Sequence, residues 1–202
     1  MKWGKEGAEL ATAIEQIVGV FGPLPSHALD TFAAKYGSFY GHTFPPEFAS
    51  QEVVPALVEQ QRIYSLPSNK VSWRPGKKTG ADDRKNELAY WVFLEHMNGS
   101  ALTSLMRGPA PAVATYFKCG NLYHIIVCSG AGETELGLGA HLTEQTDQRR
   151  LGDSRSIQEK FLVVFTSNQY LDQAETQRIS NALFAVVTLD SNGSPSIKFV
   201  KR

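Results

Sequence analysis

The feature that most constrains the fold is an ordered series of apolar segments near the carboxyl end of the chain. Residues 160–166 form a nearly continuous apolar run, residues 171–183 place apolar side chains on one helical face, and residues 184–189 form a second run. Short runs of this kind are typical of buried strands. A strand, a helix and a strand in succession predict two parallel strands of one sheet, because a helical crossover returns the chain to the end where the first strand began.

Further segments of the same half predict additional strands. Residues 112–118 and 121–128 are rich in β-branched and aromatic residues and flank Cys119-Gly120, so we predict a hairpin with a two-residue turn. Residues 196–200 follow a polar turn sequence and predict a last antiparallel strand. The second half of the chain therefore predicts a mixed sheet.

Helical patterns precede this sheet, and a glycine-rich segment interrupts it. A cap at Asp82 or Asp83 begins a helix with aromatic residues on more than one face. Ser100 is the predicted cap of a shorter helix that continues to Arg107. Residues 129–156 are rich in glycine, but the phosphate-binding motifs GxxxxGK[ST] and GxGxxG do not occur there. We therefore predict a loop that passes into a polar helix.

The amino-terminal part begins with two helical patterns. Apolar residues recur at three- and four-residue steps over residues 8–20, and Gly22-Pro23 ends that helix. Ser26 is the predicted cap of a second helix, with Gly37 as its terminator. A helix, a short turn and a helix are the expected result.

A third helix and a hairpin follow. The helix over residues 50–58 requires Pro55 to lie in its first turn, where the missing N–H is not needed. Residues 62–66 and 70–74 alternate around the turn triplet Pro67-Ser68-Asn69, which predicts two antiparallel strands.

Three helices closed by a two-stranded hairpin resemble the winged helix-turn-helix family. The resemblance covers about residues 8–75, and residues 56–64 resemble the family's junction between the third helix and the wing. It implies a module whose third helix enters the DNA major groove while the wing contacts the flanking backbone.

The length of the chain predicts two domains of unequal size. At 202 residues it exceeds one typical domain of ~100–150 residues but hardly fills two. Residues 75–80 are polar and contain glycine, as linkers between domains do. We therefore predict an α+β protein with a winged helix-turn-helix domain over residues 1–76 and a mixed-sheet α/β domain over residues 81–202.

The element order of the second domain resembles a variant of the restriction-endonuclease-like fold. With the winged helix before it, the arrangement resembles replication-relaxation-type families carried by bacterial plasmids and conjugative elements. The resemblance spans most of the chain through its architecture, without a diagnostic residue string. Nucleases of this fold hold a divalent cation with an Asp on one core strand and a Glu-x-Lys on the next.

The residues that such a nuclease requires are missing from the expected positions. The core strands 121–128 and 161–166 contain no carboxylate, and Glu-x-Lys does not occur in the chain. Glu159 and Lys160 are adjacent, so on a strand they point to opposite faces. We expect a degenerate domain without catalytic activity, and a metal-dependent nuclease is the remaining enzyme alternative.

Other catalytic and ligand-binding patterns are missing as well. The five histidines occur singly, without GxSxG or HExxH, and His124 would lie ~13 Å from Cys128 on one strand. Cys119 and Cys128 are expected to be buried, free thiols. We predict no catalytic residue, no metal site and no cofactor.

The charge of the chain limits how it can contact nucleic acid. Lys plus Arg and Asp plus Glu number 20 each, so the formal net charge is zero and DNA contact requires a local patch. The third helix carries mainly Glu and Gln, whereas cations gather in and after the wing. The predicted phosphate contacts are Arg62, Lys70, Arg74, Lys77 and Lys78.

Two functions remain open at this point. The first is a non-enzymatic DNA-binding or regulatory protein, associated with a mobile element or plasmid, that contacts double-stranded DNA through the wing. The alternative is a module whose winged helix binds a protein, with Trp73, Tyr90, Trp91 and Phe93 in the interface. A homodimer through the second domain is compatible with both. The start has no signal region and no apolar run approaches ~20 residues, which predicts a cytoplasmic protein without a membrane segment.

Overall fold

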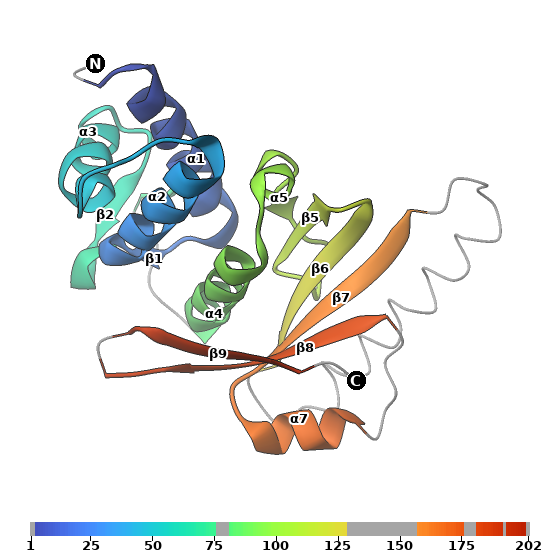
Figure 1. The fold of residues 1–202 in the computed structure, drawn as a ribbon. Coiled ribbons are helices and arrows are strands. Elements are labelled where there is room, and N and C mark those ends of the chain that lie inside the picture. Colours follow the sequence, from blue (N-terminus) through green and yellow to red (C-terminus); the bar gives the residue numbers. More distant parts are fainter. Residues whose placement is uncertain (1–2, 76–80, 129–156, 176–180, 192, 201–202) are drawn as a thin grey trace. The chain divides into compact units, whose positions relative to one another are not determined.

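The computed structural model describes residues 3–75, 81–128, 157–175, 181–191 and 193–200. Within them the protein is α+β, with a three-stranded antiparallel sheet and a mixed six-stranded sheet (Figure 1). The chain divides into two compact units. The first consists of Met1–Glu87 and Met97–Thr103, and the second of Leu88–His96 and Ser104–Arg202.

The division falls inside helix α4 (Ala81–His96), and the segment Met97–Thr103 belongs to the first unit. The domain boundary predicted between residues 76 and 81 stays a prediction. The predicted linker, residues 75–80, lies outside the described residues except for Pro75. The composition of α4 changes at the division, from the mainly charged residues 81–87 to the mainly apolar residues 88–96, although the pattern predicts one continuous helix.

The first helix of the first unit follows its predicted pattern. Helix α1 (Lys5–Phe21) buries Leu10, Ile14 and Ile17 completely. It ends at Gly22, whose N–H donates to the carbonyl oxygen of Val18 at 3.0 Å. The predicted stop at Gly22-Pro23 is therefore confirmed.

The second helix differs from its prediction at both ends. Strand β1 (Leu24–Pro25) leads directly into α2 (Ser26–Tyr40), and the Ser26 hydroxyl donates to the backbone oxygen of Asn69 at 3.0 Å, so Ser26 does not cap the helix. The helix passes Gly37 and ends before Gly41, which adopts the left-handed conformation with φ +73°. Gly37 has another role, because a Cβ there would lie 2.6 Å from the backbone oxygen of His42.

The third helix begins with a wide turn. The π-helical segment η1 (Ala49–Val53) precedes α3 (Val54–Glu59), and the Val54 N–H donates to Ala49, five residues back. Pro55 lies in the first turn of α3, as its missing N–H requires. The prediction for this helix is confirmed.

A hairpin follows the third helix in the first unit. Strands β2 (Tyr64–Leu66) and β3 (Lys70–Ser72) pair antiparallel around the short 3₁₀ turn η2 (Pro67–Asn69). The predicted hairpin is confirmed. The sequence pattern did not predict that β1 would pair with β3, which gives the sheet order β1-β3-β2.

The second unit is built on a mixed sheet. The strand order follows the chain, and β6, β7 and β8 are mutually parallel while the outer pairs are antiparallel. Both predicted hairpins and the predicted parallel pair are confirmed. The strands are β4 (Met106–Arg107), β5 (Ala114–Lys118), β6 (Asn121–Cys128), β7 (Gln158–Phe165), β8 (Ala182–Leu189) and β9 (Pro195–Val200).

Two helix predictions in this part of the chain are wrong in extent. Helix α5 (Gly99–Thr103) stops before β4, and Asn98 caps it, because its Oδ1 accepts from the Ala101 N–H at 3.1 Å. Helix α7 (Asn168–Glu175) begins before the predicted Leu171, and Ala182, which was predicted to be helical, pairs with Phe161 in the sheet; residues 176–180 lie outside the described residues. In each case strand pairing, which periodicity alone does not reveal, sets the boundary.

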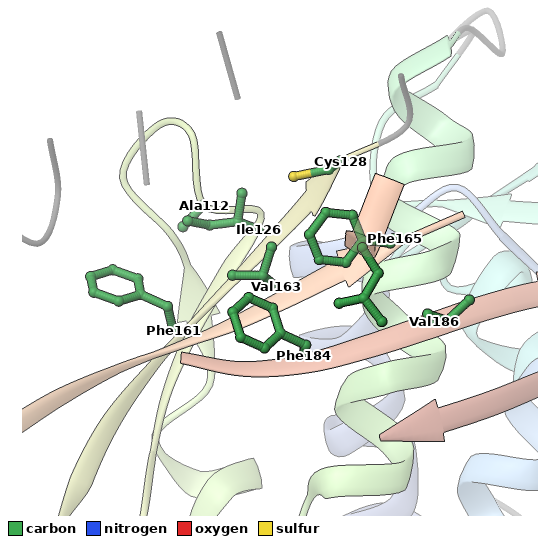
Figure 2. Close-up of a cluster of buried hydrophobic side chains, with 9 residues drawn as sticks. Ala112, Ile126, Cys128, Phe161, Val163, Phe165, Phe184 and Val186 are labelled. Atoms are coloured by element: carbon green, nitrogen blue, oxygen red, sulfur yellow. The ribbon is translucent and has the colours of Figure 1, made fainter. Parts of the chain in front are cut away.

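The two faces of the sheet pack against different helices. One face carries an apolar cluster that includes Phe165 and Phe184 (Figure 2). Leu171 of α7 belongs to the same cluster. On the other face Phe93 of α4 contacts Tyr116 of β5, with ring centroids 5.0 Å apart. Cys128 lies in the apolar cluster, whereas Cys119 is exposed in the β5–β6 turn, so the expected burial is confirmed for one free thiol and wrong for the other.

Candidate functional site

Arg62, the first of the predicted DNA contacts, is held by a carboxylate of the same unit. Its Nε donates to Glu15 Oε1 at 2.5 Å, and its Nη2 donates to Glu15 Oε2. The two side chains are only 32% and 25% exposed. This two-point contact joins the end of the third helix to α1 and neutralises the guanidinium.

Lys70, at the start of β3, is also paired. Its Nζ lies 3.1 Å from Glu87 Oε2, and the two side chains are 22% and 10% exposed. Glu87 lies on α4, seventeen residues after Lys70 in the chain. The pairing with Lys70 depends on the hairpin, so helical spacing could not predict it.

Arg74 is placed differently from the other two cations. Its Cζ lies 4.2 Å from the ring centroid of Trp73, a cation–π contact on the exposed end of the hairpin. Trp73 is 36% exposed. Lys77 and Lys78 lie outside the described residues.

The outward face of the third helix forms a hollow of about 390 Å³, which we call the α3 pocket. This volume is at the lower end of the ~300–1,000 Å³ that small-ligand sites occupy. Two carboxylates and one indole are among its lining groups. The lining residues are Trp3, Gln51, Glu52, Pro55, Ala56, Glu59 and Gln60.

Trp3 is the pocket residue that sequence reasoning missed. It precedes the periodic part of α1, so no pattern included it. The signal that could have indicated its position is Gly7, where a Cβ would lie 2.5 Å from Trp3 Cβ. A glycine at the first turn of a helix leaves space for a side chain that folds back over it.

Three of the four aromatic residues predicted for a partner interface are buried, and only Trp73 is exposed. Tyr90 and Phe93 are 0% exposed and Trp91 is 4% exposed. The ring centroids of Tyr90 and Trp91 are 5.1 Å apart. A partner protein could not reach these rings without displacing the residues that cover them.

A first group of ionisable side chains in the second unit surrounds His96 at the end of α4. Its Nδ1 lies 2.7 Å from the Tyr116 hydroxyl, and Lys118 donates to its backbone oxygen at 2.5 Å. Burial, with Lys118 and Lys160 as smaller contributions, lowers the pKa of His96 to about 4. His96 is therefore a neutral hydrogen-bonding group near neutral pH, and the Tyr116 hydroxyl, whose pKa burial raises, remains protonated.

A second group lies on the opposite face of the sheet. His124 Nδ1 is 3.0 Å from the Thr115 hydroxyl, and His124 Nε2 is 3.5 Å from Glu159 Oε2 without hydrogen-bond geometry. Burial lowers the pKa of His124, and Glu159 partly opposes that effect. Sequence reasoning considered Cys128 as a partner for His124 and missed Thr115 and Glu159, because both contacts depend on strand register.

The register of β6 and β7 also places Glu159 and Lys160 on opposite faces, as predicted. Glu159 pairs with Leu122 on the face of His124, and Lys160 pairs with Tyr123 on the other face. The Lys160 ammonium lies 5.9 Å from the Tyr123 ring centroid. These two side chains cannot act together as the carboxylate and lysine of a nuclease site do.

Three further findings concern similarity to known proteins, metal ligands and membrane-spanning helices. No family model, no curated protein and no solved structure matches the chain. Within the described ranges, no three His, Cys, Asp or Glu side chains come together as metal ligands would. None of the described helices is long and apolar enough to span a bilayer.

Proposed function

We propose that this protein is a regulatory interaction protein, in which a winged helix-turn-helix unit binds a protein partner through the outward face of its third helix. The second unit is a restriction-endonuclease-like domain that does not catalyse a reaction and serves as the scaffold for partner binding or dimerisation.

The winged-helix interpretation is supported by element order. Three helical segments are followed by the hairpin of β2 and β3, and β1 between the first two helices pairs with that hairpin. The restriction-endonuclease-like interpretation is supported by a helix, three antiparallel strands and then parallel strands linked by α7.

The observation that carries the proposed protein partner is the composition of the α3 pocket. Its lining includes Glu52 and Glu59, and the described residues of the lining include neither Lys nor Arg. In a DNA-binding winged helix this surface faces the phosphates of the major groove, which repel carboxylates. Arg62 and Lys70, which could offset that repulsion, are engaged with Glu15 and Glu87.

DNA contact through the wing is the second candidate, and one observation favours it. Arg74 and Trp73 form an exposed stacked pair, and an arginine of this kind can contact a phosphate while the ring remains against the guanidinium. Binding to random duplex DNA at about 50 mM salt that weakens steeply with added salt would support this candidate. A metal-dependent nuclease is third, and divalent-metal-dependent cleavage of DNA would establish it.

Site-directed photo-crosslinking in the native cells distinguishes protein from DNA as the ligand. A photoreactive amino acid replaces Gln60 in the α3 pocket, Ser65 in the wing, or Thr12, an exposed residue of α1 that serves as the background control. We expect an adduct at position 60 that protease removes and DNase does not. A DNase-sensitive adduct at that position, or none above the level at position 12, contradicts the proposed function.

A further inference from the structure

The α3 pocket has the chemistry of a site for a cationic side chain. The Trp3 indole offers the best aromatic face for a cation, and Glu52 and Glu59 contribute two carboxylates to the same lining. Neither carboxylate forms an ion pair with another side chain in the described part of the chain. The apolar surface of Pro55 and Ala56 completes the lining and suits the aliphatic stem of a long side chain.

The local backbone holds these groups in place before a ligand binds. Gly7 lets Trp3 lie directly against α1, since any larger residue would collide with Trp3 Cβ. The π-helical turn η1 carries Gln51 and Glu52, and turns of this kind are frequent at functional sites. The Gln51 side chain is itself anchored by donation to the Glu47 carboxylate. A site assembled in advance loses less conformational entropy on binding.

We propose that the α3 pocket binds an arginine side chain in a basic segment of the partner protein. A planar guanidinium stacks on an indole and can donate to two carboxylates, whereas the compact, strongly hydrated ammonium of lysine cannot do both equally well. The inference rests on the proposed function and deepens it, because it states the chemistry by which the partner is recognised. Charge complementarity supports this occupant, because the surface carries two carboxylates that form no ion pair with another described residue.

The test uses the full chain labelled with ¹⁵N and a nonapeptide that contains three arginines separated by Gly and Ser. Matched peptides carry lysine or the neutral isostere citrulline in place of arginine. We expect the arginine peptide to shift the Trp3 indole N–H and the amides of residues 51–60, with an affinity about 10-fold higher than that of the citrulline peptide. The lysine peptide is expected to bind with intermediate affinity.

Variants identify the groups responsible. We expect Trp3→Ala to weaken binding of the arginine peptide about 5-fold, and Glu52→Gln or Glu59→Gln about 3-fold each. Asp172→Asn, on α7 and outside the pocket lining, makes the same change in net charge and should leave the affinity unchanged. Gly7→Ala should weaken binding while every pocket side chain is retained, because it displaces Trp3.

Equal affinity for the arginine and citrulline peptides, or a loss of affinity in Asp172→Asn as large as in Glu52→Gln, overturns the inference. Protein adducts at position 60 combined with either result leave the proposed function standing and remove only the arginine site. Absence of those adducts removes the proposed function whatever the peptides do. The two failures are therefore distinguishable.

Discussion

In the second unit the histidines at the sheet contact hydroxyl groups of neighbouring strands, whereas in the first unit the carboxylates of the α3 pocket face a solvent-accessible hollow. His96 contacts Tyr116, and His124 contacts Thr115. Glu52 and Glu59 have no comparable partner among the described residues. Buried polar groups that satisfy each other contribute to folding, while exposed groups around a cavity are available to a ligand. The difference separates side chains that maintain the structure from side chains that can recognise a partner.

The largest effect is expected from the core of the sheet. Phe165 is 0% exposed and contacts Phe184, with ring centroids 6.2 Å apart. Phe165→Ala removes a large buried side chain and leaves a cavity, so we expect a loss of about 3–5 kcal/mol in the free energy of unfolding. Urea denaturation followed by circular dichroism measures it. Ile157→Ala, at a side chain that is 52% exposed, is the control and should change stability by less than about 0.5 kcal/mol.

The next largest effect is a pH dependence of the free energy of unfolding that arises from His96. Its folded-state pKa of about 4 lies below the ordinary value of 6.5, so the unfolded chain takes up a proton first as the pH falls. The stability is therefore fully present above about pH 6.5 and is lost between that value and about pH 4. We expect a loss of about 2 kcal/mol from this group, allowing for partial solvent screening.

Two variants isolate the contribution of His96 from that of His124, which acts in the same direction. His96→Gln should reduce the stability difference between about pH 7.5 and pH 4.5 by roughly 2 kcal/mol. His27→Gln, at an exposed position of α2, should leave that difference unchanged. A pH profile of stability that is the same in His96→Gln as in the wild type would show that the imidazole is not shielded as the structure indicates.

A smaller effect is expected from the ion pair of Arg62 and Glu15. This pair is intermediate between the buried polar contacts of the sheet and the exposed carboxylates of the α3 pocket. Both side chains are partly exposed, but the contact is bidentate. A double-mutant cycle with Glu15→Ala and Arg62→Ala should give a coupling energy of about 1 kcal/mol. A coupling energy near zero would mean that Glu15 does not hold Arg62 in solution, so that Arg62 could contact DNA. It would weaken the contrast between paired side chains and the carboxylates of the α3 pocket.

The sequence predicted those parts of the molecule that depend on local pattern. The hairpins around Cys119-Gly120 and Pro67-Ser68-Asn69 follow from turn chemistry, and the parallel pair of β7 and β8 follows from the strand, helix, strand order. Boundaries that depend on pairing were missed, as at Ala182 and Met106. Hydrophobic periodicity does not show at which residue a segment begins to pair with a strand that is distant in the sequence.

The candidate site was less accessible to sequence reasoning than the fold. The acidic and amide character of the third helix was visible in the sequence, and it reduced the expectation that this helix reads DNA bases. Trp3 was not visible, because its place in the pocket depends on a close approach to Gly7. The pairing of Lys70 with Glu87 was equally hidden, since the two residues belong to different elements that only the tertiary structure brings together.

The smallest expected effect is the sharpest test of the contrast between the two units. Glu52 and Glu59 are exposed and have no cationic partner among the described residues, so their charges should contribute nothing to folding. The double variant Glu52→Gln, Glu59→Gln should therefore unfold within about 0.5 kcal/mol of the wild type, with any change towards greater stability, because a repulsion between like charges is removed. Equilibrium urea denaturation at low ionic strength makes the measurement, since salt would screen the repulsion. A loss of about 1 kcal/mol or more would mean that these carboxylates maintain the structure. The carboxylates of the α3 pocket would then have a structural role, like the polar groups of the sheet, and they could no longer be assigned to partner binding.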